Sequence, residues 1–144
     1  MFKDIRLPEP LRKRIDAGVR DASAIVQDDL ERYYSLLDLV GEEMTGHFSI
    51  EEASHLCDVF RSTAMDTKRL ASWPSFLAWD VEDVEKYEKL GAGAGIETER
   101  LIDKLERLTV VQAIWVWHSI RLCWETAPQG GPRDDDLKII FRTG

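Results

Sequence analysis

The chain has 144 residues, of which 44% are hydrophobic and 32% charged, and its formal net charge is −8 at pH 7. This composition is that of an ordinary globular chain with enough apolar mass for a core. The acidic balance argues against nucleic-acid binding over the whole surface, because phosphates would be repelled. The charge is uneven, however. Residues 1–20 sum to +3 and the remainder to −11, so a basic end precedes an acidic body.

The cysteines and the apolar segments indicate a protein of a reducing compartment. Cys57 and Cys123 lie far apart within apolar helical patterns, which predicts buried free thiols and no disulfide framework. The N-terminus lacks the apolar segment of a signal peptide. The most apolar run, residues 110–120, is too short to span a bilayer. We therefore expect a cytoplasmic protein without a membrane partner.

The N-terminal residues predict a short strand followed by two helices. Apolar and polar residues alternate over residues 2–7, which favours a strand ended by Pro8. Apolar residues four positions apart predict a basic helix over residues 9–19. A second helix is expected over residues 24–38 with a wide apolar face, and Ser23 suits its N-cap position.

The central part of the chain predicts further helices. Ser49 with Glu52, and Thr109 with Gln112, have the spacing of capping boxes that open a helix. The helix after Thr109 is apolar nearly all round and carries three tryptophans, so we expect it in the centre of a bundle. Glycines at 41 and 91–95 mark connections. One helix is expected to begin after Ser49. Three more are expected over residues 75–90, 97–107 and 110–126.

Residues 128–144 are rich in turn-forming residues, and residues 137–141 are expected to form a short strand or a mobile end. The predicted fold class is mainly α, with a short N-terminal ribbon-forming strand followed by a bundle of about six helices. The predicted segments are residues 1–40 for dimerisation and DNA contact, 47–127 for the helical body and 128–144 for the tail.

Two segments at the N-terminus carry a resemblance to a known family. Residues 7–11, Leu-Pro-Glu-Pro-Leu, resemble the strand-to-helix junction of ribbon–helix–helix repressors and antitoxins, and residues 23–33 resemble their second helix. The resemblance implies that two chains pair their strands into a ribbon in the DNA major groove, while the second helix offers its N-terminus to a phosphate. The residues it implies as DNA contacts are Phe2, Asp4, Arg6, Arg12, Lys13, Ser23 and Ala24.

Residues further along the chain resemble a second group. Residues 48–58, and later residues 101–113, are similar to uncharacterised helical proteins of bacterial mobile elements. That group has no established activity, so its resemblance implies a helical body and no particular chemistry.

Candidate chemistry elsewhere is sparse. Glu52 and His55 are three residues apart, as carboxylate and imidazole are in di-iron bundles, but no second such pair follows. We therefore expect a surface pair on a helix. His118 is expected at the edge of the core, and its pairing with Cys57 as base and nucleophile has no support from spacing. No catalytic residue, metal ligand or cofactor is predicted.

The sequence thus predicts a small, non-enzymatic, dimeric DNA-binding regulator whose helical body binds a protein partner. The alternative is a helical interaction or adaptor protein that does not bind DNA. In a regulator, the basic residues of the first twenty positions should form one positive surface; in an adaptor, they would scatter or pair with acids.

Overall fold

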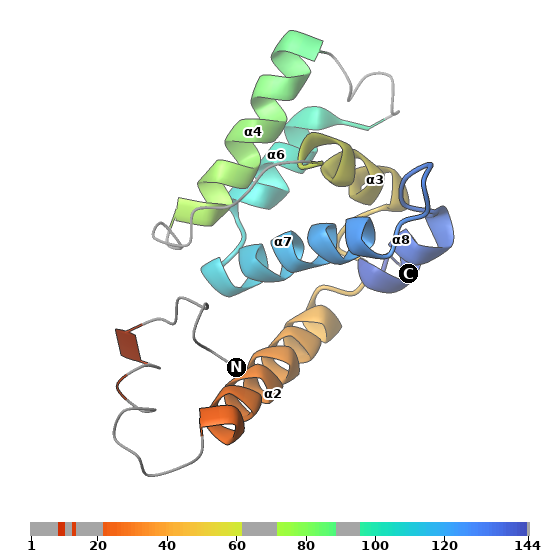
Figure 1. Cartoon of the computed structure of the whole chain (residues 1–144). Coiled ribbons are helices and arrows are strands. Elements are labelled where there is room, and N and C mark those ends of the chain that lie inside the picture. The colour runs from red at the N-terminus through yellow and green to blue at the C-terminus, as the bar shows by residue number, and fades with distance from the viewer. Residues whose placement is uncertain (1–8, 11–12, 14–21, 62–71, 89–95, 144) are drawn as a thin grey trace. The chain divides into compact units, whose positions relative to one another are not determined.

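The computed structural model describes residues 9–10, 13, 22–61, 72–88 and 96–143. These residues form helices, and they contain no strand (Figure 1). The prediction of a mainly α fold is therefore confirmed. The strand expected at residues 2–7 lies outside the described residues, as do most of the helix expected at 9–19 and the glycine run 91–95. The helices are α2 (Ala22–Glu43), α3 (Ile50–Val59), α4 (Trp73–Glu88), α6 (Thr98–Glu106), α7 (Val110–Glu125) and α8 (Asp134–Ile140).

The chain divides into two compact units, residues 1–39 and residues 40–144. In the first unit, the structure describes mainly residues 22–39 of α2. In the second unit, α4 packs along α6, and α7 contacts α3, α4 and α8 (Figure 1). The central place predicted for the helix after Thr109 agrees with these three neighbours of α7.

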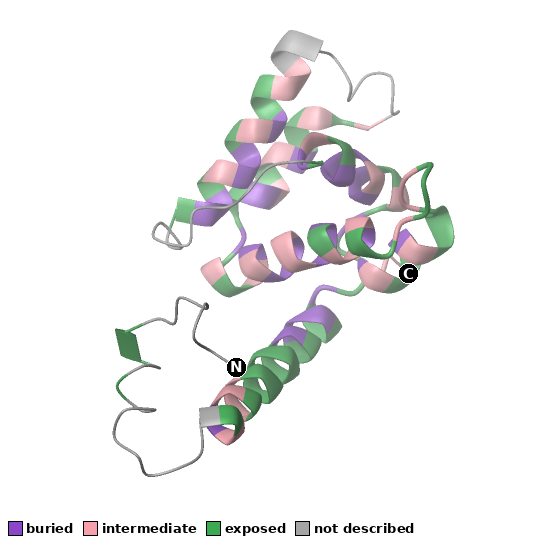
Figure 2. Ribbon diagram, viewed as in Figure 1, coloured by how far each residue is buried: buried purple, intermediate pink, exposed green. Residues whose placement is uncertain are grey.

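The core of the second unit is built from apolar residues at helical spacing. Each helix turns one apolar stripe inward, which is how amphipathic helices bury their apolar area. On α7 the buried residues gather on one side of the helix (Figure 2). They include Trp115, whereas Trp117 and Trp124 are half-buried. The fully buried side chains of these stripes include Leu56, Leu77, Val81, Leu101, Leu105, Val116 and Ile120.

Both predicted capping boxes are present. The hydroxyl of Ser49 accepts a hydrogen bond from the Glu52 amide at 3.1 Å, and the Glu52 carboxylate accepts one from the Ser49 amide at 2.9 Å. Thr109 and Gln112 make the same reciprocal pair at 3.2 and 2.9 Å. Each box satisfies amide donors that have no partner within the first turn of a helix.

Helix α2 is longer than predicted, because Gly41 lies within it and does not end it. A Cβ atom at Gly41 would lie 2.8 Å from Nε of Arg142 and 3.0 Å from Nε1 of Trp115. The glycine is therefore a point of close packing. The helix also begins at Ala22, so Ser23 lies inside its first turn and the predicted N-cap role of Ser23 is wrong.

The C-terminal segment is a helix, and the expected strand or mobile end is wrong. Three aspartates occupy the first turn of α8 and Lys138 its last turn, which suits the helix dipole at both ends. Leu137 and Phe141, four residues apart, are both buried. The Phe141 ring packs edge-on against Phe48 and Trp115, with centroids 6.4 and 6.0 Å away.

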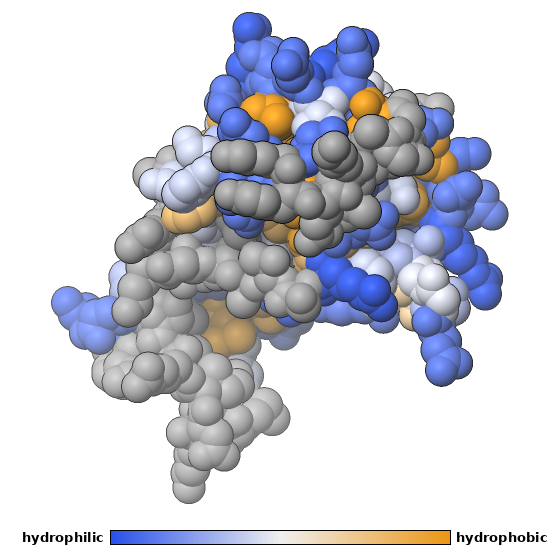
Figure 3. Space-filling model, turned by 90° about the horizontal axis from the view of Figure 1, so that it is seen from above, coloured by the Kyte–Doolittle hydropathy of each residue, from blue (hydrophilic) through white to orange (hydrophobic). Residues whose placement is uncertain are grey.

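The described surface is largely polar in the view of Figure 3, where apolar residues show only in small patches. Of the helices that the structure describes, none combines the length and the apolar character needed to cross a bilayer.

Helix α4 begins two residues before its predicted start, with Pro74 in its first turn, where a missing amide hydrogen costs no hydrogen bond.

Candidate functional site

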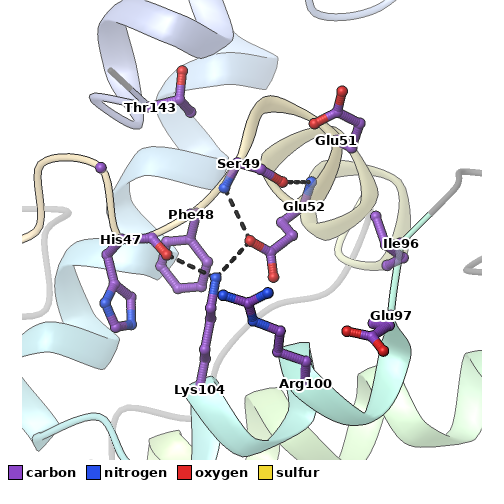
Figure 4. A pocket seen from close by; sticks show the side chains of 11 residues that line it. His47, Phe48, Ser49, Glu51, Glu52, Ile96, Glu97, Arg100, Lys104 and Thr143 are labelled. Carbon is purple, nitrogen blue, oxygen red and sulfur yellow. Dashed lines mark hydrogen bonds and ion pairs between the residues drawn. The ribbon is translucent and has the colours of Figure 1, made fainter.

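A polar pocket of about 500 Å³ lies between the N-terminus of α3 and helix α6 (Figure 4). The chain reaches it from three directions: the segment before α3, the first turns of α6, and Thr143 near the C-terminus. Its charged residues are Glu51, Glu52, Glu97, Arg100 and Lys104.

Lys104 is the centre of this pocket. Its ammonium nitrogen lies 2.7 Å from Oε1 of Glu52 and 2.9 Å from the carbonyl oxygen of His47. It also lies 5.8 Å from the centroid of the Phe48 ring, within cation–π range. The Glu52 oxygen that receives Lys104 is the same one that receives the Ser49 amide. These two charges therefore satisfy each other and join α6 to the capped start of α3.

Arg100 is one turn earlier on α6 and differs from Lys104. Its side chain is exposed, and among the described residues its guanidinium makes no hydrogen bond or ion pair. Two further carboxylates, Glu51 and Glu97, are also exposed at the pocket. The free groups thus carry both signs of charge, which selects neither an anion nor a cation. The pocket is better explained as a joint between two helices than as a ligand site.

His47 does not change this conclusion. Its pKa is lowered, first by burial and then by the neighbouring Lys104 charge, against an opposing effect of Glu52. The imidazole is therefore neutral at pH 7, and it adds no positive charge for an anionic ligand.

The predicted pair of Glu52 and His55 is not on the surface. Glu52 is 7% exposed and His55 is 1% exposed, so the expectation of a surface pair is wrong. The carboxylate of Glu52 is used by Lys104, and Nε2 of His55 has no hydrogen-bond partner among the described residues. No group of three potential metal ligands occurs in the part of the chain that the structure describes.

The two cysteines lie together, which sequence reasoning missed. Both are free and buried, as predicted. The neighbouring thiol of Cys123 on α7, and then burial, raise the pKa of Cys57 on α3. His118 is not among the groups that shift the pKa of Cys57; its own pKa is lowered by burial. No sequence signal indicates the pairing, because 65 residues separate the two thiols.

The predicted DNA contacts are only partly visible. Phe2, Asp4, Arg6 and Arg12 lie outside the described residues. Lys13 is exposed, and so is Ser23 in the first turn of α2, next to the half-buried Ala24. Among the described residues, only Ser23 and Ala24 lie together, and they are already adjacent in the sequence. The DNA-contact surface stays a prediction.

Apolar side chains gather on the outside of α2. Leu30 is 49% exposed, Tyr34 52% and Leu39 65%, and Tyr33 and Leu36 have similar exposure. Residues 30–36 are all exposed, and Figure 2 shows this part of α2 in green. Single exposed apolar residues are normal, but a contiguous group is typical of an interaction surface. We call Leu30, Tyr33, Tyr34, Leu36 and Leu39 the α2 apolar surface.

Comparison with known proteins supplies no relative. The chain matches no protein-family model, no curated protein and no solved structure. The resemblances to ribbon–helix–helix proteins and to helical proteins of mobile elements therefore do not hold. The physical reason is that capping residues and apolar spacing recur in most amphipathic helices. The segment expected as the family's second helix is part of α2, a single helix of 22 residues.

Replacing Lys104 by Met tests the joint between α3 and α6. The side chains of Lys104 and Glu52 are 20% and 10% exposed, so the variant leaves a largely buried carboxylate without its cation. Allowing for partial solvent screening, we expect the free energy of unfolding to fall by about 1–2 kcal/mol in urea titrations. The matched control is Lys138→Met, an exposed lysine of α8, which should stay within about 0.5 kcal/mol of the parent. Equal stabilities of the two variants would refute the role assigned to Lys104.

Replacing His55 by Leu tests the buried imidazole. Burial lowers the pKa of His55, opposed by Asp58 and Glu85, so below about pH 6.5 the unfolded chain takes up its proton more readily than the folded one. The free energy of unfolding should therefore decrease as pH falls through this range, and less steeply in His55→Leu. One proton accounts for at most about 1.4 kcal/mol per pH unit.

The pH comparison is made by urea unfolding between about pH 7.5 and pH 5. His47 and His118 also have lowered pKa values, and Asp80 has a raised one. All three are present in both proteins, so their effects cancel in the difference. Parallel pH profiles of parent and variant would show that His55 does not titrate as described.

Proposed function

We propose that this chain is a helical protein-interaction module that associates with a second copy of itself through α2. The observation that carries the proposal is the α2 apolar surface, which holds two tyrosines and three leucines at 40% to 65% exposure. Tyrosine is enriched at protein interfaces, because its ring is apolar and its hydroxyl still finds a polar partner. The proposal assigns the chain no enzymatic role.

The spacing along α2 favours a second copy as the occupant. Leu30, Tyr33, Leu36 and Leu39 follow one another at intervals of three residues, and Tyr34 is four residues from Leu30. Residues three or four positions apart are neighbours on a helix, so these side chains form one continuous row, and two identical helices can pack such rows against each other. Charged residues border the row, because Asp28, Glu31 and Arg32 line a shallow groove together with Leu36 and Leu39.

The energetics indicate weak, reversible association. Complete burial of a leucine-sized side chain contributes about 1.5–3 kcal/mol, and the side chains of this surface are already partly covered. Several such contributions from each copy have to offset an association cost of about 4–15 kcal/mol. A dissociation constant of roughly micromolar size is therefore expected.

The pocket at α6 gives less support for an alternative role. Its lysine and buried glutamate are occupied with each other, and only Arg100 offers a free positive charge there. An apolar surface in water has a direct driving force for association, whereas a satisfied ion pair has none.

Sedimentation velocity over a range of concentrations around micromolar tests the proposal. The full chain should shift from monomer to dimer as concentration rises. Leu30→Glu with Tyr33→Glu puts two carboxylates into the α2 apolar surface, and it should weaken association at least about tenfold. The matched control, Trp79→Glu with Ile139→Glu, adds the same charge at exposed apolar positions of the second unit.

The control variant should dimerise like the parent apart from a small, salt-dependent loss. Circular dichroism establishes that all three proteins keep their helix content. A monomer at every concentration would overturn the proposal. Equal weakening by the two double variants would reduce the effect to net charge and would likewise contradict the assigned surface.

A further inference from the structure

Two buried thiols from distant parts of the sequence meet in the core of the second unit. Cys57 is on α3 and Cys123 on α7, with exposures of 2% and 0%. The two side chains interact, since the neighbouring Cys123 thiol is the first cause of the raised pKa of Cys57. An independent contact fixes the same two helices at this point, since the indole nitrogen of Trp124 donates to the carbonyl oxygen of Cys57 at 3.0 Å.

A small cavity reaches one of the two thiols. Its volume is about 160 Å³, and Cys57 lines it together with Ser54, Trp124 and the segment Gly130–Pro132. A water molecule takes about 30 Å³ of liquid, so the cavity admits a molecule of the size of hydrogen peroxide. Cys123 does not line this cavity. The two thiols therefore differ in access, although they are neighbours.

We propose that Cys57 and Cys123 form an oxidisable pair that hydrogen peroxide converts into a disulfide between α3 and α7. Cys57, which lines the cavity, reacts first and Cys123 resolves the intermediate. The inference is independent of self-association through α2, because both cysteines belong to the second unit.

The reaction has two balanced steps. In the first, the Cys57 thiolate attacks one peroxide oxygen; an S–O bond forms, the O–O bond breaks, and the departing hydroxide takes a proton to become water. In the second, the Cys123 sulfur attacks the Cys57 sulfur; the S–S bond forms and the S–O bond breaks, so that a second water leaves with the remaining proton. Two thiols are thus oxidised by two electrons while one peroxide is reduced to two waters.

The environment makes this reaction slow at neutral pH. Thiolate, and not thiol, is the nucleophile, and burial with the neighbouring thiol raises the pKa of Cys57. The rate of disulfide formation should therefore increase with pH. Once formed, the disulfide closes a loop that contains α4 and α6, which should raise the thermal unfolding midpoint.

The test uses the folded full chain, treated with hydrogen peroxide and then unfolded in the presence of an alkylating reagent. Intact-mass measurement should show the loss of two hydrogens and no alkylation, and proteolysis should yield the peptides of Cys57 and Cys123 joined together. Cys123→Ser should trap the sulfenic acid of Cys57, which a 1,3-dione reagent captures. Cys57→Ser should leave Cys123 as an unmodified thiol after the same exposure.

Three results would overturn the inference. They are an unchanged mass, a gain of oxygen without loss of hydrogen, and a disulfide that joins two chains instead of Cys57 to Cys123. Equal capture of sulfenic acid in the two serine variants would refute the assigned order. If either variant loses its circular-dichroism signature, the mass and peptide map of the parent chain alone decide the existence of the disulfide.

Discussion

The burial of apolar helix faces is the constraint on which this structure depends. In residues 40–144 the inward stripes of the helices meet one another, and residues such as Leu56, Leu101 and Ile120 reach 0% exposure. Residues 22–39 of α2 follow the same apolar spacing but leave much of it in water. Because exposed apolar area favours association, this difference directs attention to α2 as the surface that acts on another molecule.

Polar groups have a different role in the second unit, where they fix helix ends and crossings. The Ser49–Glu52 capping box would satisfy the start of α3 even without α6. Lys104 adds a bond to the same Glu52 oxygen and another to the His47 carbonyl, so one ammonium group links a helix start to a neighbouring helix. A pocket forms around this joint because charged side chains pack less tightly than apolar ones, and its presence alone does not imply a ligand.

The sequence predicted the features that depend on short-range spacing. The two capping boxes and the helix after Thr109 follow from residues within four positions of each other. Features that depend on distant residues escaped it. From the sequence, Gly41 was expected to mark a connection. In the structure it lies within α2, and the side chains of Arg142 and Trp115 pack closely against it. The three C-terminal aspartates were expected in a turn. They begin helix α8, whose Leu137 and the following Phe141 are buried in the core.

The candidate sites show the same limit. Glu52 and Lys104 are 52 positions apart, and no local sequence pattern predicts that they pair. The meeting of Cys57 with Cys123 is equally hidden, although the burial of each was predictable from its apolar surroundings. The apolar side of α2 was visible in the sequence as a wide apolar face of the segment predicted to dimerise and contact DNA, but spacing did not show how much of that face stays exposed. Apolar periodicity identifies a face to be covered, and it does not identify what covers it.

The central claim is that α2 is covered by a second copy of the chain. Amide hydrogen exchange of the full chain, compared in dilute and in concentrated solution, tests it most directly, because it reports the protection of each helix separately. The account predicts that exchange in α2 over residues 26–37 slows as concentration rises, while exchange in α6 over residues 101–105 stays constant. Protection of α2 that does not depend on concentration would contradict the claim.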